Sequence, residues 1–278
     1  MITRFAPSPT GPLHLGHAYA ALVAHDMARA AGGAFLLRIE DIDRARSKPE
    51  WEAQIYEDLH WLGISWDGEV MRQSDRLPAY RATLEKLWAD GLLYACNCTR
   101  RDIEAAVTAP QEGAPLGPDG IIYPGTCRLK GAPKPGEPLP KAALRLRMDL
   151  AACTCSFEET GPAHRGTHPI TPAQMTNTVG DVVLARREMG TSYHLAVVLD
   201  DAAQGITHVT RGEDLFEATQ IHVTLQKLLG LPVPIYHHHG LIRDEAGKRL
   251  AKRDDARALS KYRAEGASPA DIRRLVGL

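Results

Sequence analysis

Two histidines, His14 and His17, stand where a loop rich in proline and glycine changes into an amphipathic helical pattern. Prolines at positions 7, 9 and 12 exclude regular helix from the loop, and Gly16 lets the backbone approach a ligand closely. A helix N-terminus favours anions, because it presents unpaired N–H groups and the positive end of the helix dipole. Two imidazoles there would complete a phosphate site. Histidines at this spacing also form structural pairs, and the spacing alone leaves both interpretations open.

Carboxylates follow the next apolar run, in the segment 38–43, which reads Arg-Ile-Glu-Asp-Ile-Asp. Grouped carboxylates bind cations or metals, or transfer protons. The same pattern is typical of a solvated surface on which acids pair with the two arginines that follow. The residues alone leave these interpretations open as well.

The five cysteines offer two ways to hold a metal. Cys96 and Cys98 are separated by one residue, a spacing that lets two thiolates share one tetrahedral zinc ion, and Cys127 follows in the same irregular region. Cys153 and Cys155 form a second close pair, and a four-cysteine site made of both pairs is physically allowed. The alternating pattern over 144–148 favours it less, since it predicts a strand continuing to the second pair, where cysteines pack in a core.

The remaining pattern supplies the elements that position these residues. Periodic apolar residues predict helices over 16–31, from a capping box at Ser47 and Glu50 to Gly63, over 77–91 and over 215–230. Apolar runs and alternation predict strands over 34–39, 144–148, 195–199 and 206–210. Residues 95–140 are rich in glycine and proline and show little periodicity, which indicates an insertion.

These elements predict an α/β fold, with a Rossmann-like doubly wound parallel sheet split by an inserted subdomain. We expect the core over 1–82 and 183–240, the insertion over 83–182 and a short helical C-terminal segment over 241–278. Ligands of such sheets bind beyond the carboxyl ends of the strands. The loop before His17 and the segment 38–43 should therefore border one crevice.

Composition agrees with a cytoplasmic enzyme. The chain has 278 residues, is 44% hydrophobic and carries a net charge of −1, which excludes a simple polybasic nucleic-acid binder. We see no signal peptide and no apolar run long enough to span a membrane. From position 243 onward, ten Lys and Arg stand against six Asp and Glu, which gives weak support for a phosphate-rich partner.

The turn around His14, Gly16 and His17 resembles the HIGH signature of class I aminoacyl-tRNA synthetases, and the wider loop is similar to their glutamyl branch. The segments 38–43, 193–201 and 210–215 are similar to further motifs of that branch, in the same order. The resemblance implies that the turn binds the phosphates of ATP, with Mg²⁺. It also implies a glutamate site made of Arg4, Phe5, Ala6, Pro7, Ser8, Glu40, Tyr193 and Arg211.

A last motif, Arg249-Leu-Ala-Lys-Arg253, resembles the family's KMSKS signature in altered form. Its second lysine is retained as Lys252, whereas arginine and alanine replace the first lysine and the first serine. A lysine on a glycine-flanked loop neutralises charge as pyrophosphate leaves. The resemblance implies that Lys252 binds ATP and acts in catalysis with His14 and His17. Without the resemblance, the segment fits a basic surface loop.

Only 25 residues, 254–278, follow this motif, whereas full-length glutamyl-tRNA synthetases continue into a helical domain that reads the anticodon. We therefore expect no anticodon-binding domain. The shorter plan is similar to the glutamyl-queuosine tRNA(Asp) synthetases. This resemblance implies tRNA-independent activation of L-glutamate with ATP and transfer of glutamate to the queuosine base of tRNA(Asp). It also implies one Zn²⁺ per chain, held by Cys96, Cys98, Tyr123 and Cys127. We expect a monomer, because no long apolar surface pattern demands a partner.

Three alternatives remain at this point. The chain could be a truncated glutamyl-tRNA synthetase that charges tRNA(Glu). It could be another nucleotidylyl-transfer enzyme, since the H-x-G-H pattern also occurs there, but that leaves Glu40, Tyr193 and Arg211 unexplained. A non-catalytic RNA-binding paralogue is the third, and the altered lysine motif is its only support.

Overall fold

The computed structural model describes residues 1–107, 115–242 and 257–278. Its N-terminal part holds a parallel sheet in the order β1-β2-β3, with helices α1 and α2 in the connections. The bounds are β1 Ile2–Phe5, α1 Leu15–Ala30, β2 Ala34–Ile39, α2 Pro49–Trp61 and β3 Met71–Arg72. The helix predicted over 16–31 and the strand predicted over 34–39 are thus confirmed.

A second sheet has the order β11-β12-β8-β9, in which β11, β12 and β8 are parallel and β9 is antiparallel. Its strands and the two helices beside them are β8 Cys155–Glu159, β9 Gly166–Ile170, α7 Tyr193–Ala203, β11 His208–Gly212, α8 Thr219–Leu228 and β12 Ile235–His239. The 3-10 turn η3 (Glu213–Leu215) follows β11. The strand predicted over 206–210 is confirmed, shifted by two residues, and α8 begins four residues later than predicted.

The two sheets meet along β1 and β11. The amide of Thr207 donates to the carbonyl of Ile2 at 3.0 Å, and the Arg4 side chain donates to the carbonyl of Thr210 at 3.2 Å. The parallel strands β1, β2, β11 and β12 therefore end on one side of the joined sheets. This is the α/β core with a parallel sheet that the sequence predicts, and it places the strand ends where ligands of such folds bind.

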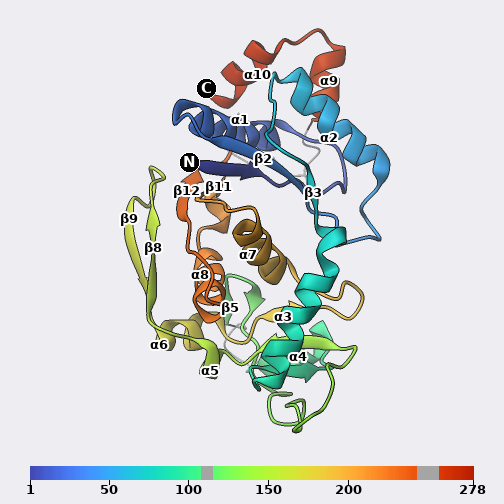
Figure 1. Cartoon of the computed structure of the whole chain (residues 1–278), viewed down its shortest axis with the longest axis vertical. Coiled ribbons are helices and arrows are strands. Elements are labelled where there is room, and N and C mark those ends of the chain that lie inside the picture. The colour runs from blue at the N-terminus through green and yellow to red at the C-terminus, as the bar shows by residue number, and fades with distance from the viewer. Residues whose placement is uncertain (108–114, 243–256) are drawn as a thin grey trace.

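The segment between the halves builds its own sheet in the order β10-β7-β4, which is antiparallel. Its elements are η1 Gln73–Arg76, α3 Leu77–Ala89, β4 Leu93–Cys96, α4 Arg100–Val107, β5 Leu116–Gly117, β6 Gly120–Ile121, β7 Ala143–Leu146, α5 Met148–Ala151, α6 Pro172–Gln174, η2 Met175–Val179 and β10 Val183–Ala185. Figure 1 shows α4 at the opposite end of the molecule from α1, with α3 running between them. Because β8 pairs with β12 and β9 pairs with β8, part of the interval 83–182 belongs to the core sheet.

Three local predictions are wrong. The run over 195–199 belongs to helix α7, which Ser192 begins by accepting a hydrogen bond from the amide of Leu195. Seven of its eleven residues are buried, so the helix shows no polar face from which its period could be read. The capping box is absent, because α2 begins at Pro49 with no side-chain cap. The strand over 144–148 ends at Leu146, since Met148 begins α5.

Of the C-terminal helices, α10 (Pro269–Val276) packs against α1, and α9 (Leu259–Ala264) lies beside α2 (Figure 1). The fully buried Leu259 and Ile272 share one hydrophobic core with α1, β1 and β2. Arg273 on α10 forms two hydrogen bonds with the carboxylate of Asp26 on α1, at 2.7 and 3.0 Å. This helical segment therefore supports the sheet half that carries the His14 turn.

Candidate active site and cysteine cluster

His14 and His17 lie where the loop meets helix α1, and their side chains accept hydrogen bonds from backbone amides there. The Nδ1 of His14 accepts from the amide of Gly16 at 3.1 Å, while the amide of His14 donates to the Nδ1 of His17 at 3.2 Å. The two rings lie 3.8 Å apart between centroids. Both histidines are thus structural caps, and when neutral each ring carries its proton on Nε2. The structural interpretation of the spacing is confirmed, since both side chains cap the helix.

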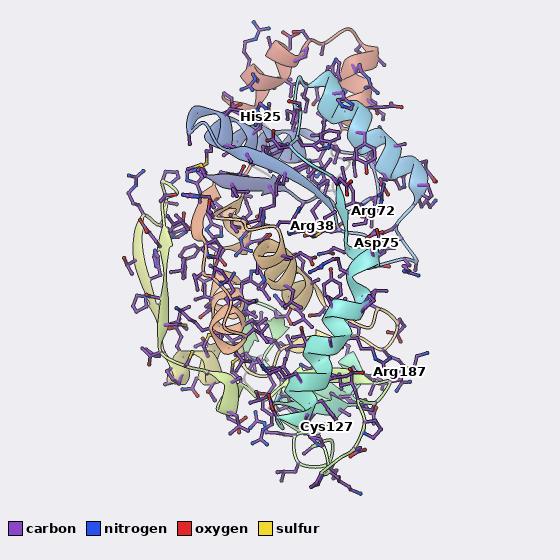
Figure 2. The ribbon with its side chains drawn as sticks, in the orientation of Figure 1. His25, Arg38, Arg72, Asp75, Cys127 and Arg187 are labelled. Atoms are coloured by element: carbon purple, nitrogen blue, oxygen red, sulfur yellow. The ribbon has the colours of Figure 1, made fainter. Side chains whose placement is uncertain are left out.

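A buried cluster of charges joins the ends of β1 and β2 to α7. The carboxylate of Asp201 accepts from Nε of Arg4 at 3.0 Å and from Arg38 at 2.7 Å, and Arg38 also donates to Glu40 at 3.1 Å. Burial raises the pKa of Asp201, but the two arginines outweigh it and the pKa is lowered. At Glu40 the balance is opposite, because burial outweighs the effect of Arg38 and raises the pKa. Figure 2 labels Arg38 between the two halves of the molecule.

Arg211 stands at the end of β11 and is 7% exposed. Its Nε donates to His238 at 3.0 Å, and its two terminal nitrogens donate to His222 at 2.9 Å and Thr219 at 2.7 Å. Within the described ranges, its guanidinium pairs with no carboxylate. Among the described residues, Arg211 is therefore a buried cation that no carboxylate contacts directly.

Tyr193 is the first residue of α7 and stays 36% exposed. Its ring packs edge-on against His222, with centroids 5.6 Å apart. Burial raises the pKa of its phenol, and the charges of Arg211, Glu40 and Arg4 also act on it. Four of the predicted glutamate contacts, Arg4, Glu40, Tyr193 and Arg211, thus lie around one region. The amide of Glu40 donates to the carbonyl of Pro7 at 3.0 Å, which holds the neighbouring predicted segment, Phe5 to Ser8, against β2.

The predicted catalytic Lys252 and the motif around it lie outside the described residues.

Cys96, Cys98 and Cys127 bring their sulfurs within 4.8 Å of one another. The hydroxyl of Tyr123 lies 3.5 Å from the sulfur of Cys96 and 3.3 Å from that of Cys98. A tetrahedral zinc with Zn–S bonds of about 2.3 Å spaces its sulfurs by about 3.8 Å. Three thiols and a phenol at these separations fit a four-coordinate metal. Arg145 borders the cluster, since its Nε donates to Cys96 at 3.4 Å.

The alternative site made of two Cys-x-Cys pairs is wrong. Cys155 lies on β8 in the core sheet, away from Cys96 and Cys98, and burial raises its pKa to about 11. In the described part of the chain, the three cysteines named above are the one group that could hold a metal.

A cavity of 650 Å³ opens beside the cysteine cluster. Arg186 and Arg187, both exposed, line it from the loop after β10, and Asp119 lines it from the β5–β6 hairpin. Figure 2 labels Arg187 and Cys127 at the same end of the molecule. The cavity therefore joins the cysteine cluster to the loop that leads into α7 and Tyr193.

Sequence reasoning missed four residues that hold the site together: Arg38, Asp201, His222 and His238. An arginine within the apolar run of β2 was a usable signal for Arg38, because an unpaired cation does not enter a core. The histidines give no such signal in the sequence, since their neighbours come from β11 and α7.

Comparison with known proteins decides the family. The model of the class I tRNA synthetases (E and Q), catalytic domain, matches residues 1–278. The chain belongs to this family of class I tRNA synthetases. A relative named glutamyl-Q tRNA(Asp) synthetase from Rhodobacter capsulatus is 80% identical over 278 residues, which cover 100% of both chains. One of the same name from Geobacter sulfurreducens is 43% identical over 264 residues, covering 95% of this chain and 79% of that protein.

Solved structures of this synthetase family show the same fold. A glutamate tRNA ligase from Elizabethkingia meningosepticum, in complex with its amino acid, superposes with a TM-score of 0.78 at 28% identity. This chain is covered to 99% and spans 60% of the length of that ligase. A glutamate-tRNA synthetase from Elizabethkingia anophelis gives a TM-score of 0.77 at 29% identity, with 99% and 61% of the two chains covered. Among the described residues of this class I synthetase, none of the helices is long and apolar enough to cross a membrane.

Proposed function

We propose that this protein activates L-glutamate with ATP and then transfers the glutamate to the queuosine base in the anticodon loop of tRNA(Asp). The observation that carries the proposal is the buried Arg211, which forms no ion pair with a described carboxylate and acts electrostatically on Tyr193 together with Glu40. A guanidinium and a carboxyl group around one tyrosine suit an amino acid with a side-chain carboxylate and an ammonium group. The name of the relative that is 80% identical supports the same substrate and acceptor.

Each proposed contact has a chemical reason. The Glu40 carboxylate binds the α-ammonium group of glutamate, while Arg211 binds the side-chain carboxylate with N–H donors that its three internal hydrogen bonds leave over. Tyr193 offers its hydroxyl to the same substrate. Arg4 contributes less charge to the substrate, because Asp201 already neutralises it. The segment from Phe5 to Ser8 lies next to Glu40, through the hydrogen bond between Pro7 and Glu40.

ATP binds with its phosphates at the N-terminus of α1. The Nε2 groups of His14 and His17 donate to them, the backbone at Gly16 allows close approach, and Lys252 supplies a further cation. Mg²⁺ neutralises charge on the phosphates when bound. An oxygen of the α-carboxylate attacks the α-phosphorus of ATP, a P–O bond forms, and the bond to pyrophosphate breaks. Glutamyl-adenylate remains, and catalysis consists of positioning and charge stabilisation.

In the second step, a hydroxyl of the queuosine cyclopentenediol attacks the activated carbonyl. The new ester bond forms as the bond to AMP breaks, AMP leaves with the electron pair, and the proton of the hydroxyl passes to solvent. The exposed Arg186 and Arg187 beside the 650 Å³ cavity are suited to bind the phosphates of the anticodon stem-loop. This placement keeps the RNA next to the loop that leads to Tyr193.

One Zn²⁺ would be held by Cys96, Cys98, Cys127 and the phenolate of Tyr123. The spacing of these four groups supports the assignment. A metal there would connect the end of β4 to the 123–127 turn, beside the cavity. The same proposal includes a cytoplasmic location, a monomeric state and a division into core, insertion and C-terminal segment, with β8 and β9 counted with the core.

The decisive experiment supplies labelled glutamate and ATP with tRNA(Asp) that carries or lacks queuosine, and with tRNA(Glu). We expect glutamate-dependent pyrophosphate exchange without any tRNA, and label only on tRNA(Asp) that carries queuosine. Label on tRNA(Glu) would instead identify a truncated glutamyl-tRNA synthetase. Absence of glutamate-dependent exchange would identify a non-catalytic RNA-binding paralogue.

A further inference from the structure

Arg211 differs from the other two arginines buried at the strand ends. Arg4 and Arg38 both pair with the carboxylate of Asp201. The three hydrogen bonds of Arg211 go instead to imidazole and hydroxyl acceptors. Such acceptors orient a guanidinium without neutralising it, so its charge stays available to an anionic ligand.

One of these acceptors begins a directed chain of hydrogen bonds. Arginine only donates, so Nδ1 of His222 must accept from Arg211, and the His222 proton sits on Nε2. That proton is donated to Nδ1 of His194 at 3.0 Å. His194 therefore carries its own proton on Nε2, which lies 3.2 Å from the carboxylate of Asp119. Burial, followed by the charge of Arg211, lowers the pKa of His222 well below its usual value, which agrees with a neutral ring.

A second acceptor is fixed in the same way. Nε2 of His238 accepts from Arg211, so its proton sits on Nδ1 and is donated to the buried Glu159. Burial raises the pKa of Glu159, but hydrogen bonds from the side chain and amide of His238 outweigh it and lower the pKa to about 2. Glu159 is thus an anion one histidine away from Arg211. Each hydrogen-bond chain from Arg211 thus ends at a carboxylate, Asp119 beyond His222 and His194, and Glu159 beyond His238. The carboxylate fixes the tautomer in which His222 or His238 accepts from Arg211.

The two carboxylates differ in location. Glu159 is 1% exposed on the core strand β8. Asp119 lies in the turn between β5 and β6, in the insertion, and its side chain is 41% exposed. The chain from Arg211 through His222 and His194 thus runs from the buried strand end to the surface of the insertion.

We propose that Asp119, His194 and His222 are positioning residues, which hold Arg211 oriented and uncompensated so that it binds the side-chain carboxylate of the amino-acid substrate. The inference rests on the proposed function, since it takes that substrate to be glutamate. Without Asp119, the Nε2 proton of His194 loses its acceptor, and His194 is free to change tautomer. The tautomer of His222 that accepts from Arg211 is then no longer fixed. The guanidinium then samples other orientations, and binding of the carboxylate weakens.

The test uses the full chain and glutamate-dependent pyrophosphate exchange without tRNA. We expect Asp119→Ala to raise the KM for glutamate by about three- to tenfold, with the KM for ATP and the kcat at saturating glutamate nearly unchanged. Asp119→Asn keeps an acceptor oxygen for His194, so it should restore most of the affinity. Asp90→Ala, which removes another exposed carboxylate at the end of α3, is the matched control and should leave both KM values unchanged.

A double-mutant cycle separates this role from a merely structural one. His194→Asn keeps the acceptor for His222 but does not reach Asp119, so it cuts the same link. The variant Asp119→Ala/His194→Asn should then be no worse than His194→Asn alone. An unchanged glutamate KM in Asp119→Ala, with an active wild-type enzyme, would overturn the inference, as would equal rises in both KM values. A wild-type enzyme without glutamate-dependent exchange would refute the proposed function itself.

Discussion

Arg145 lies over the ring of Tyr123, with its guanidinium carbon 3.9 Å from the ring centroid, and donates from Nε to the sulfur of Cys96. Three thiolates and a phenolate around a divalent ion leave a net charge of −2, and Arg145 is the cation that contacts two of these groups. The arginine thus stabilises the deprotonated ligands that a metal requires.

We therefore expect Arg145→Ala to weaken retention of zinc by about ten- to a hundredfold. The zinc affinity of each variant is measured by competition with a chelator of known affinity. Arg145→Lys keeps the charge but not the planar contact with Tyr123, so its zinc affinity should lie between those of Arg145→Ala and the wild type. Arg147→Ala, on the same segment but paired with Asp149, is the control. Equal retention in Arg145→Ala and the wild type would contradict the assigned contact.

His17→Ala tests the phosphate turn. It removes a donor at the N-terminus of α1, so we expect glutamate-dependent pyrophosphate exchange to fall by about a hundred- to a thousandfold. Because His17 also caps the helix, the thermal midpoint of unfolding is measured beside it. His25→Ala changes a histidine of the same helix that contacts Phe35 and Asp26 instead, and it should retain exchange. A normal rate of pyrophosphate exchange in His17→Ala would show that His17 does not bind the phosphates of ATP.

Glu40→Gln tests the ammonium contact. The amide oxygen still accepts from Arg38, but the negative charge is lost, so the KM for glutamate should rise by about ten- to a hundredfold while the KM for ATP changes little. Asp43→Asn is the matched control, because Asp43 lies in the same segment and pairs with the exposed Arg46. If the two variants had the same glutamate KM, Glu40 would not contact the substrate.

Arg187→Ala tests the docking of RNA. We expect the KM for tRNA(Asp) to rise by about three- to tenfold and to depend less steeply on salt, since a phosphate contact is lost. Pyrophosphate exchange without tRNA should stay unchanged. Arg81→Ala is the comparison, because Arg81 is an exposed arginine paired with Glu85 on α3. An effect on exchange but not on transfer would place Arg187 at the activation site instead.

Asp58 on α2 predicts a pH dependence of stability. It is fully buried, neither carboxylate oxygen has a hydrogen bond, and Arg263 on α9 lies 3.7 Å away. Burial outweighs this arginine and raises the pKa of Asp58 to about 6 from its usual 3.8. The native state thus binds more protons than the unfolded state between these values, so stability falls as pH rises through this window.

Asp58→Asn should remove the loss of stability that accompanies ionisation of the buried Asp58 as the pH rises. We expect the free energy of unfolding at pH 7.5 to increase by about 1 to 2 kcal/mol, with little gain at about pH 3, where both states are largely protonated. Urea unfolding at the two pH values measures it. Glu57→Gln changes the exposed neighbour that also pairs with Arg263, and should have no such effect. A gain of the same size at both pH values would disprove the buried charge as its cause.

The spacing of apolar residues and the position of turn residues predict those helices and strands that have a simple burial pattern. Helix α1 and strand β2 were found within a residue, because one has a single buried face and the other is an apolar run between turn signals. Helix α7 was taken for a strand, since its polar residues Asp200 and Asp201 are buried too. Their partners, Tyr80 and Arg4, come from distant elements that no local pattern reveals.

The sequence by itself determined the family motifs, the parallel α/β core and the residues that carry charge toward a nucleotide and an amino acid. These depend on residue type and local spacing, which a linear chain displays directly. Only the tertiary structure decided which cysteines share a site and which arginine keeps its charge. Arg4 and Arg211 look alike in the sequence, yet one meets the carboxylate of Asp201 and the other meets His222. The difference arises because folding brings together side chains from α7, α8 and β11.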